Sequence, residues 1–71
     1  MLHFDNNPTI HLHRPVIMTS VAQALGVKPF ELLAELIQIQ IFVAPHQTLA
    51  DENVHALGHR IGVNFHIDED G

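Results

Sequence analysis

The sequence contains no cysteine, and this absence excludes disulfide bonds, thiolate zinc sites and cysteine nucleophiles together. A chain of 71 residues is also close to the size at which a single hydrophobic core becomes marginal. Because no covalent link is available, the core must carry the fold alone or share it with a partner chain. The hydrophobic content of 46% is ordinary for a globular protein, so we expect one small folded domain.

Long apolar runs are absent as well. No stretch approaches the roughly 18 apolar residues of a membrane-spanning helix. The N-terminus lacks the basic start and the apolar centre of a signal peptide. We therefore expect a cytoplasmic protein that does not associate with a membrane.

Basic residues are few. Three lysines and arginines stand against eight aspartates and glutamates, which gives a net charge of -5. Proteins that bind phosphate backbones depend on the opposite imbalance, so non-specific nucleic-acid binding is disfavoured. Seven histidines accompany this acidic charge, and the electrostatic character of the chain should change between about pH 7.5 and 5.5, where unperturbed imidazoles titrate.

The stretch from Thr19 to Leu36 has the outline of a helix-turn-helix unit. Gly26 suits the turn because it adopts positive φ without a Cβ penalty, and Pro29 suits the first turn of the second helix. The apolar residues at helical spacing are Val21, Ala22 and Leu25 before the turn and Leu32, Leu33, Leu36 and Ile37 after it. Such a unit serves either as a nucleic-acid reader or as a packing unit in a small interaction domain.

The chain divides into a flexible N-terminal arm over residues 1–9, a single module over residues 10–67 and an acidic tail over residues 68–71. The elements expected in the module are an extended edge segment over residues 10–18, a helix capped by Thr19 or Ser20, a helix over residues 29–38, a strand over residues 40–45, a helix capped by Thr48 or Asp51 and ended by Gly62, and a strand over residues 63–67. This β-α-α-β-α-β order predicts an α+β fold with three helices packed on a short antiparallel sheet.

The helical faces predict which side chains form the core. Apolar residues recur there at spacings of three and four, as on the inward face of an amphipathic helix. The residues expected to be buried together are Ala22, Leu25, Leu33, Leu36, Val54, Leu57 and Ile61.

Residues 15–62 resemble the small N-terminal domain of bacterial translation initiation factor two. The matching positions are Val21-Ala22, Leu25-Gly26-Val27, Glu31-Leu32-Leu33, Leu36, Leu49 and Gly62. The chain departs from the family pattern at Gln40, where the family usually has glycine, and at Ala50, where it usually has an acidic helix cap. A non-glycine residue in the left-handed region costs roughly 1 kcal/mol, so we expect a reshaped junction at Gln40 with strand pairing that begins earlier. The resemblance implies a module that docks on a ribosomal, RNA or protein partner.

The sequence has no GxxxxGK[ST] phosphate loop, which excludes the GTP hydrolysis of the complete factor. Its acidic residues are scattered rather than convergent, so we do not expect an enzyme. The preferred function is a non-catalytic, translation-associated binding module that docks through Gln23, Lys28 and Glu31. The alternative is a self-associating or protein-interaction module without a nucleic-acid role. A helix-turn-helix DNA reader is a weaker alternative, because its second helix would offer Lys28 against the carboxylates of Glu31 and Glu35.

Histidines form two pairs with side chains on one side of an element. His55 and His59 are four residues apart on one expected helix, and His11 and His13 project from the same side of a strand. Two ligands do not make a closed metal site, and the sequence fixes no third. We therefore expect solvated surface histidines, no cofactor and only fortuitous metal binding at His55 and His59.

Overall fold

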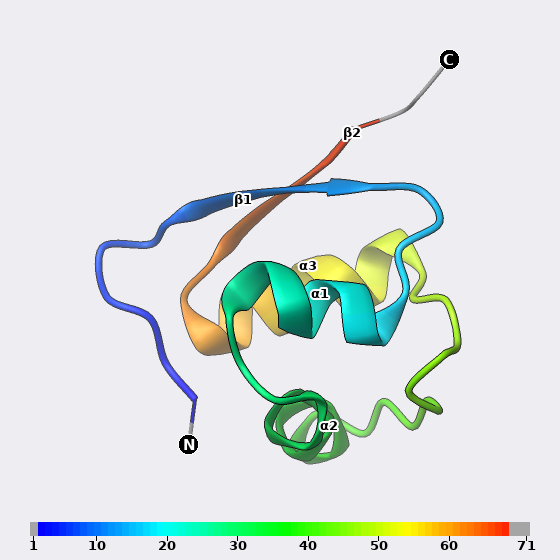
Figure 1. Cartoon of the computed structure of the whole chain (residues 1–71). Coiled ribbons are helices and arrows are strands. Elements are labelled where there is room, and N and C mark those ends of the chain that lie inside the picture. Colours follow the sequence, from blue (N-terminus) through cyan, green and yellow to red (C-terminus); the bar gives the residue numbers. More distant parts are fainter. Residues whose placement is uncertain (1, 69–71) are drawn as a thin grey trace.

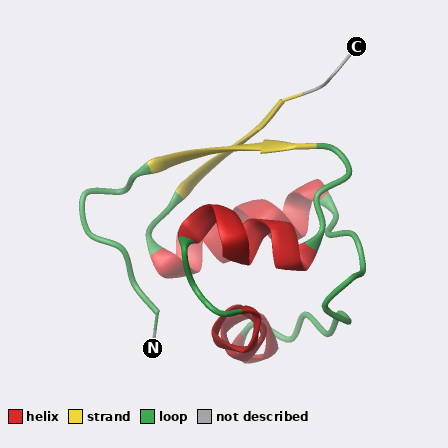
Figure 2. Cartoon of the chain, viewed as in Figure 1, coloured by secondary structure: helices red, strands yellow, loops and turns green. Residues whose placement is uncertain are grey.

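The computed structural model describes residues 2–68 as three helices and two strands (Figures 1 and 2). In chain order the elements are β1 (Thr9–His13), α1 (Met18–Leu25), α2 (Pro29–Gln38), α3 (Asp51–Ile61) and β2 (Asn64–Asp68). The predicted α+β class is confirmed, and α2 has the bounds that the sequence indicated. None of these helices is both long enough and apolar enough to cross a bilayer.

β1 and β2 pair in parallel, so the prediction of an antiparallel sheet is wrong. Thr9 lies opposite Asn64 and His13 opposite Asp68, with an unbroken register between them. Parallel strands need a crossover connection of a dozen or more residues, and here α1, α2 and α3 together form it. The direction of β2 thus depends on the end of the sheet at which α3 stops. No local pattern in the sequence of either strand indicates this direction.

The predicted strand over residues 40–45 is also absent from the described chain, which makes the predicted β-α-α-β-α-β order wrong. Just after this segment, an isolated antiparallel bridge joins Thr48 to Ile17. The segment has no regular secondary structure, and its alternating apolar side chains pack against the rim of the core. These side chains are Ile39, Ile41 and Val43. An alternating pattern is therefore satisfied here by a loop that turns every second side chain inward, without a neighbouring strand.

Gln40 adopts the left-handed backbone conformation that glycine adopts most easily, with a φ of 62°. Its amide donates to the carbonyl of Ile37 at 2.9 Å, and the amide of Ile41 donates to the carbonyl of Leu36 at 2.9 Å. These bonds close the end of α2 as a glycine-type turn would. The expectation of a reshaped junction with earlier strand pairing is therefore wrong, and the chain accepts the cost of a Cβ in this region.

The elements are arranged with the sheet on one side of the molecule and α2 on the opposite side (Figure 1). α1 packs against β1, and α3 packs against β2. α2 packs on α1 and α3, and it contacts neither of the two strands. The outer face of the sheet and the outer side of α2 are consequently two separate surfaces.

The core lies between these layers. Its largest fully buried side chains are Met18, Val21, Leu32, Leu36, Val54, Leu57 and Ile61. The predicted core residues that are confirmed as buried are Ala22, Leu36, Val54, Leu57 and Ile61. Leu25 and Leu33 were also predicted in the core, but they are only half-buried at its rim. The buried face of α2 includes Leu32 and Leu36, which are one helical turn apart, and Leu33 is rotated about 100° from Leu32.

Three glycines occupy positions that do not suit another residue, Gly26 and Gly62 because of their positive φ and Gly58 because of close neighbours. Gly26 and Gly62 end α1 and α3 with φ of 73° and 79°, as the sequence predicted. Gly58 has a different role, inside α3, because a Cβ there would lie 2.5 Å from the carbonyl oxygen of Val63 and 2.8 Å from the ring of Phe65. The absence of a side chain at Gly58 thus lets β2 return close along α3.

The helices lack the side-chain caps that the sequence predicted. α1 begins before Thr19, so the caps expected at Thr19 or Ser20 are wrong. α3 begins after an extended Ala50 without a capping hydrogen bond, so the caps expected at Thr48 or Asp51 are wrong as well. Asp51 lies instead in the first turn of α3, where its negative charge faces the partial positive charge of the helix N-terminus.

We expect Leu36→Ala to lower the free energy of unfolding by about 2–5 kcal/mol, because it leaves a cavity at a fully buried position. Denaturant melts measure this loss. Leu33→Ala is the matched control, since the same atoms are removed from a half-buried position one helical face away. Equal losses in the two variants would contradict the orientation of α2.

Gln40→Gly should stabilise the domain by roughly 0.5–1 kcal/mol, because relief of the left-handed strain exceeds the added freedom of the unfolded chain. Gln38→Gly, at the end of the regular part of α2, should instead destabilise it by about the same amount. Thermal or urea unfolding of both variants tests this difference. Loss of stability in Gln40→Gly would show that Gln40 does not hold positive φ.

Candidate functional site

Polar side chains that can bind a ligand gather on the outer face of the sheet. Side chains alternate along each strand, so Leu12 and Phe65 are buried toward the helices and their neighbours point outward. The outward set is Thr9, His11 and His13 on β1 and Asn64, His66 and Asp68 on β2. The parallel register places His11 opposite His66 and His13 opposite Asp68.

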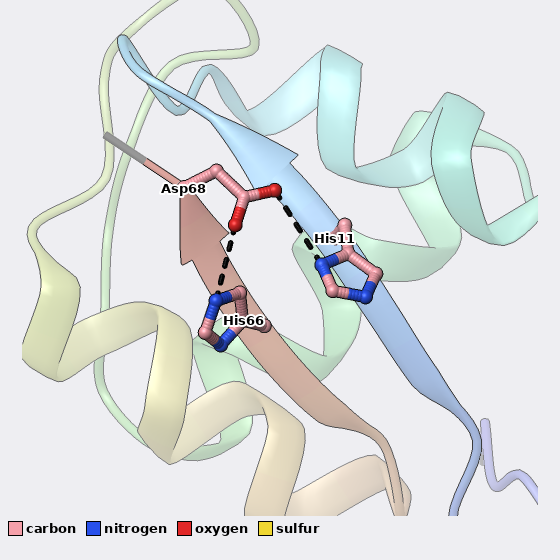
Figure 3. Close-up of side chains that lie close together, drawn as sticks. All are labelled: His11, His66 and Asp68. Carbon is pink, nitrogen blue, oxygen red and sulfur yellow. Dashed lines mark ion pairs between the residues drawn. The ribbon is translucent and has the colours of Figure 1, made fainter. Parts of the chain in front are cut away.

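Three of these side chains converge on one point (Figure 3). The Oδ1 atom of Asp68 lies 3.0 Å from Nε2 of His66, and its Oδ2 atom lies 3.4 Å from Nδ1 of His11. The two imidazole rings meet edge to face, with centroids 5.1 Å apart. Both histidine side chains are about 60% exposed, and Asp68 is 34% exposed, so the cluster opens to solvent.

Sequence reasoning found only part of this cluster. It placed His11 and His13 on one side of a strand, which the structure confirms, but it assigned Asp68 to an acidic tail. His66 and Asp68 are two residues apart in a strand and so share a face, a signal that the sequence did contain. Their approach to His11 depends on the parallel register across 55 positions, which no local pattern specifies.

The pair that the sequence singled out for fortuitous metal binding lies elsewhere. His55 and His59 are exposed on α3, beside a shallow depression of about 290 Å³ between α3 and the start of β2. Among residues 2–68, only the His11, His66 and Asp68 cluster brings three histidine or carboxylate ligands together. The structure therefore gives the α3 pair no third ligand from the described chain.

A second surface lies on the outer side of α2. Two of the residues predicted to dock a partner lie at the beginning of α2, since Lys28 precedes this helix and Glu31 is in its first turn. The third, Gln23, is on the neighbouring helix α1. Gln23 and Lys28 are exposed, and Glu31 is half-buried. The ammonium group of Lys28 lies 5.8 Å from the centroid of the Phe30 ring, within the range of a cation–π contact.

Apolar side chains dominate this surface. Phe30 is 64% exposed and Ile37 is 49% exposed, and Ala34 lies exposed between them. Positions 30, 34 and 37 follow the i, i+4, i+7 spacing of one helix face, so they form an outward stripe that we call the α2 stripe. The sequence grouped Ile37 with Leu32 and Leu36 at helical spacing, but Ile37 is exposed whereas the other two are buried. Phe42, just beyond α2, is 73% exposed.

A buried carboxylate holds the N-terminal segment against α2. Glu35 is only 5% exposed. Its Oε2 accepts a hydrogen bond from the amide of Leu2 at 2.8 Å, and its Oε1 accepts one from Nε of Arg60 on α3 at 2.7 Å. The hydrogen bond from the Leu2 amide is the main cause that lowers the pKa of the Glu35 carboxyl. Burial acts in the opposite direction, and the Arg60 guanidinium lowers this pKa further. Within the predicted N-terminal arm, Phe4 is also tied to the helices, because its amide donates to the carbonyl of Ile61 at 2.7 Å.

Comparisons of the chain with protein-family models, with curated proteins and with solved structures found no match. The resemblance to the initiation-factor domain therefore stays a prediction from the sequence.

Glu35→Gln should lower the free energy of unfolding at pH 7 by about 1–3 kcal/mol, because it leaves Arg60 with a neutral partner. The lowered pKa gives the sign of the pH effect. The ionised carboxylate contributes stability above the unfolded-state pKa of about 4.5, and this stability is lost as the pH falls through the folded-state pKa.

Urea melts from pH 7 to pH 3 should therefore show a steeper acid loss in the wild type than in Glu35→Gln. Glu52→Gln, at an exposed position of α3, is the control and should change stability at pH 7 by less than about 0.5 kcal/mol. Identical pH profiles for wild type and Glu35→Gln would exclude a role for this carboxylate in acid stability.

Proposed function

We propose that this domain is a non-catalytic binding module that docks on a basic protein through the α2 stripe. The exposure of Phe30 and Ile37 on one face of α2 is the observation that carries the proposal. Large apolar side chains gathered on one side of a small domain are typical of protein-interaction sites. An amphipathic helix face of this kind fits an apolar groove or patch of a partner.

The negative net charge of the chain favours a partner with a basic surface. Two of its three basic residues are engaged in ion pairs, Arg14 with Asp51 at 2.6 Å and Arg60 with Glu35 at 2.7 Å. The net charge of -5 therefore repels phosphate backbones and a second copy of the same chain. A basic protein surface with an apolar patch is complementary to both properties.

The resemblance to the initiation-factor domain points to the translation apparatus as the source of this partner. Ribosomal particles carry both RNA and basic proteins, so the proposal commits to the protein component. Docking through Gln23, Lys28 and Glu31 would then be an extension of the α2 stripe, since Lys28 and Glu31 flank Phe30 in the sequence.

The DNA-reading alternative receives less support. A recognition helix presents hydrogen-bond donors to base edges at its N-terminal end. Here that end offers Lys28 and the exposed ring of Phe30, followed by the carboxylate of Glu31. An apolar ring beside a carboxylate suits a protein surface better than a major groove.

A binding assay with four targets tests the proposal: ribosomal subunits, protein-free ribosomal RNA, duplex DNA and the domain itself. We expect saturable binding to the subunits at physiological salt, and at least tenfold weaker binding by Phe30→Ser/Ile37→Ser. Ala56→Ser, which changes an exposed position on α3, is the control and should bind like the wild type. Melts should show that both variants fold, because each changes only exposed side chains.

Each of the other results would contradict the proposal. Tight binding to free RNA or to duplex DNA would make the domain a nucleic-acid reader. Self-association without subunit binding would favour a homotypic module. Subunit binding that the double variant retains would place the docking surface away from α2.

A further inference from the structure

The outer face of the sheet combines the donor types that a divalent transition metal prefers. His11 and His66 supply imidazole nitrogens, and Asp68 supplies carboxylate oxygens. One nitrogen or oxygen atom from each residue lies within 4.8 Å of the others. Two imidazoles and one carboxylate favour zinc and its neighbours over calcium or magnesium, which take oxygen ligands.

The two strands hold these donor atoms near the spacing that one metal ion requires. Zinc binds nitrogen and oxygen ligands at about 2.0–2.2 Å, so the ligand atoms of a tetrahedral site are about 3.3 Å apart. The present separations, up to 4.8 Å, therefore need a closure of about 1–2 Å, which side-chain rotation of exposed residues provides. His11 and His66 are register partners, and Asp68 is two residues from His66, so rigid strands rather than loops position all three.

We propose that His11, His66 and Asp68 bind one zinc-class divalent cation on the outer face of the sheet. The ion links β1 to β2, two strands that are separated by all three helices in the sequence. The three ligands come together only when the strands pair, so the ion binds the native state and stabilises it. The three protein ligands leave a fourth position to solvent, since the cluster lies on the surface.

This site is independent of the proposed docking function. It lies on the opposite side of the molecule from the α2 stripe, and α2 contacts neither strand. The Phe30→Ser/Ile37→Ser variant should therefore bind zinc like the wild type. A failure of one proposal can thus be distinguished from a failure of the other.

Isothermal titration of the metal-free chain with zinc sulfate tests the site. We expect one ion per chain, with at least tenfold weaker binding in His11→Gln/His66→Gln and also in Asp68→Asn. The matched control is His55→Gln/His59→Gln, which removes the same two side chains from α3 and should keep wild-type affinity. Zinc should raise the melting temperature of the wild type and of this control, and it should leave that of His11→Gln/His66→Gln unchanged. Magnesium should have no effect on any of them.

Several results would overturn the proposal. One is the absence of saturable zinc binding by the wild-type chain. Another is binding that survives in His11→Gln/His66→Gln but disappears in His55→Gln/His59→Gln, which would assign the ion to α3. A third is zinc held only by dimers in sedimentation velocity, which would make the ion a bridge between copies rather than between β1 and β2.

Discussion

The parallel pairing of β1 with β2 is the constraint on which the rest of this structure depends. Two strands from opposite ends of the chain can pair in parallel only if the intervening helices return the chain to the same end of the sheet. The return is tight, because Gly58 lets Val63 and Phe65 approach α3 closely. A shift of one residue in the register would bring His66 toward the core and expose Phe65. Burial of Phe65 therefore fixes the strand register, and this register determines that His11 lies beside His66 on the outer face of the sheet.

The second constraint is the scarcity of basic residues, because both arginines form ion pairs within the domain. Arg60 neutralises the buried Glu35, and Arg14 forms a bidentate pair with Asp51 at the start of α3. Glu35 also binds the amide of Leu2, so one carboxylate joins α2, α3 and the N-terminal segment. These two ion pairs therefore offset part of the repulsion among the acidic side chains.

Local signals in the sequence were sufficient to locate the three helices, but not to predict how α1 and α3 begin. The bounds of α2 and the left-handed ends at Gly26 and Gly62 follow from proline, glycine and apolar periodicity alone. The sheet was not predictable in this way. An alternating pattern after Gln40 indicated a strand where the chain forms a loop, and the direction of β2 depends on packing of the whole crossover. The His11, His66 and Asp68 cluster was missed for the same reason, because strand register is a long-range property.

The absence of cysteine gives the proposed metal site a physical rationale. A small core gains much from a link between distant segments, and without thiols the side chains that can hold such a link are imidazoles and carboxylates. An ion held by His11, His66 and Asp68 would join β1 to β2. Its effect would reach α2 only through the core, because α2 contacts neither strand. The ion would therefore stabilise the fold that carries the α2 stripe without changing the shape of the stripe itself, so docking affinity and metal occupancy should be coupled only through stability.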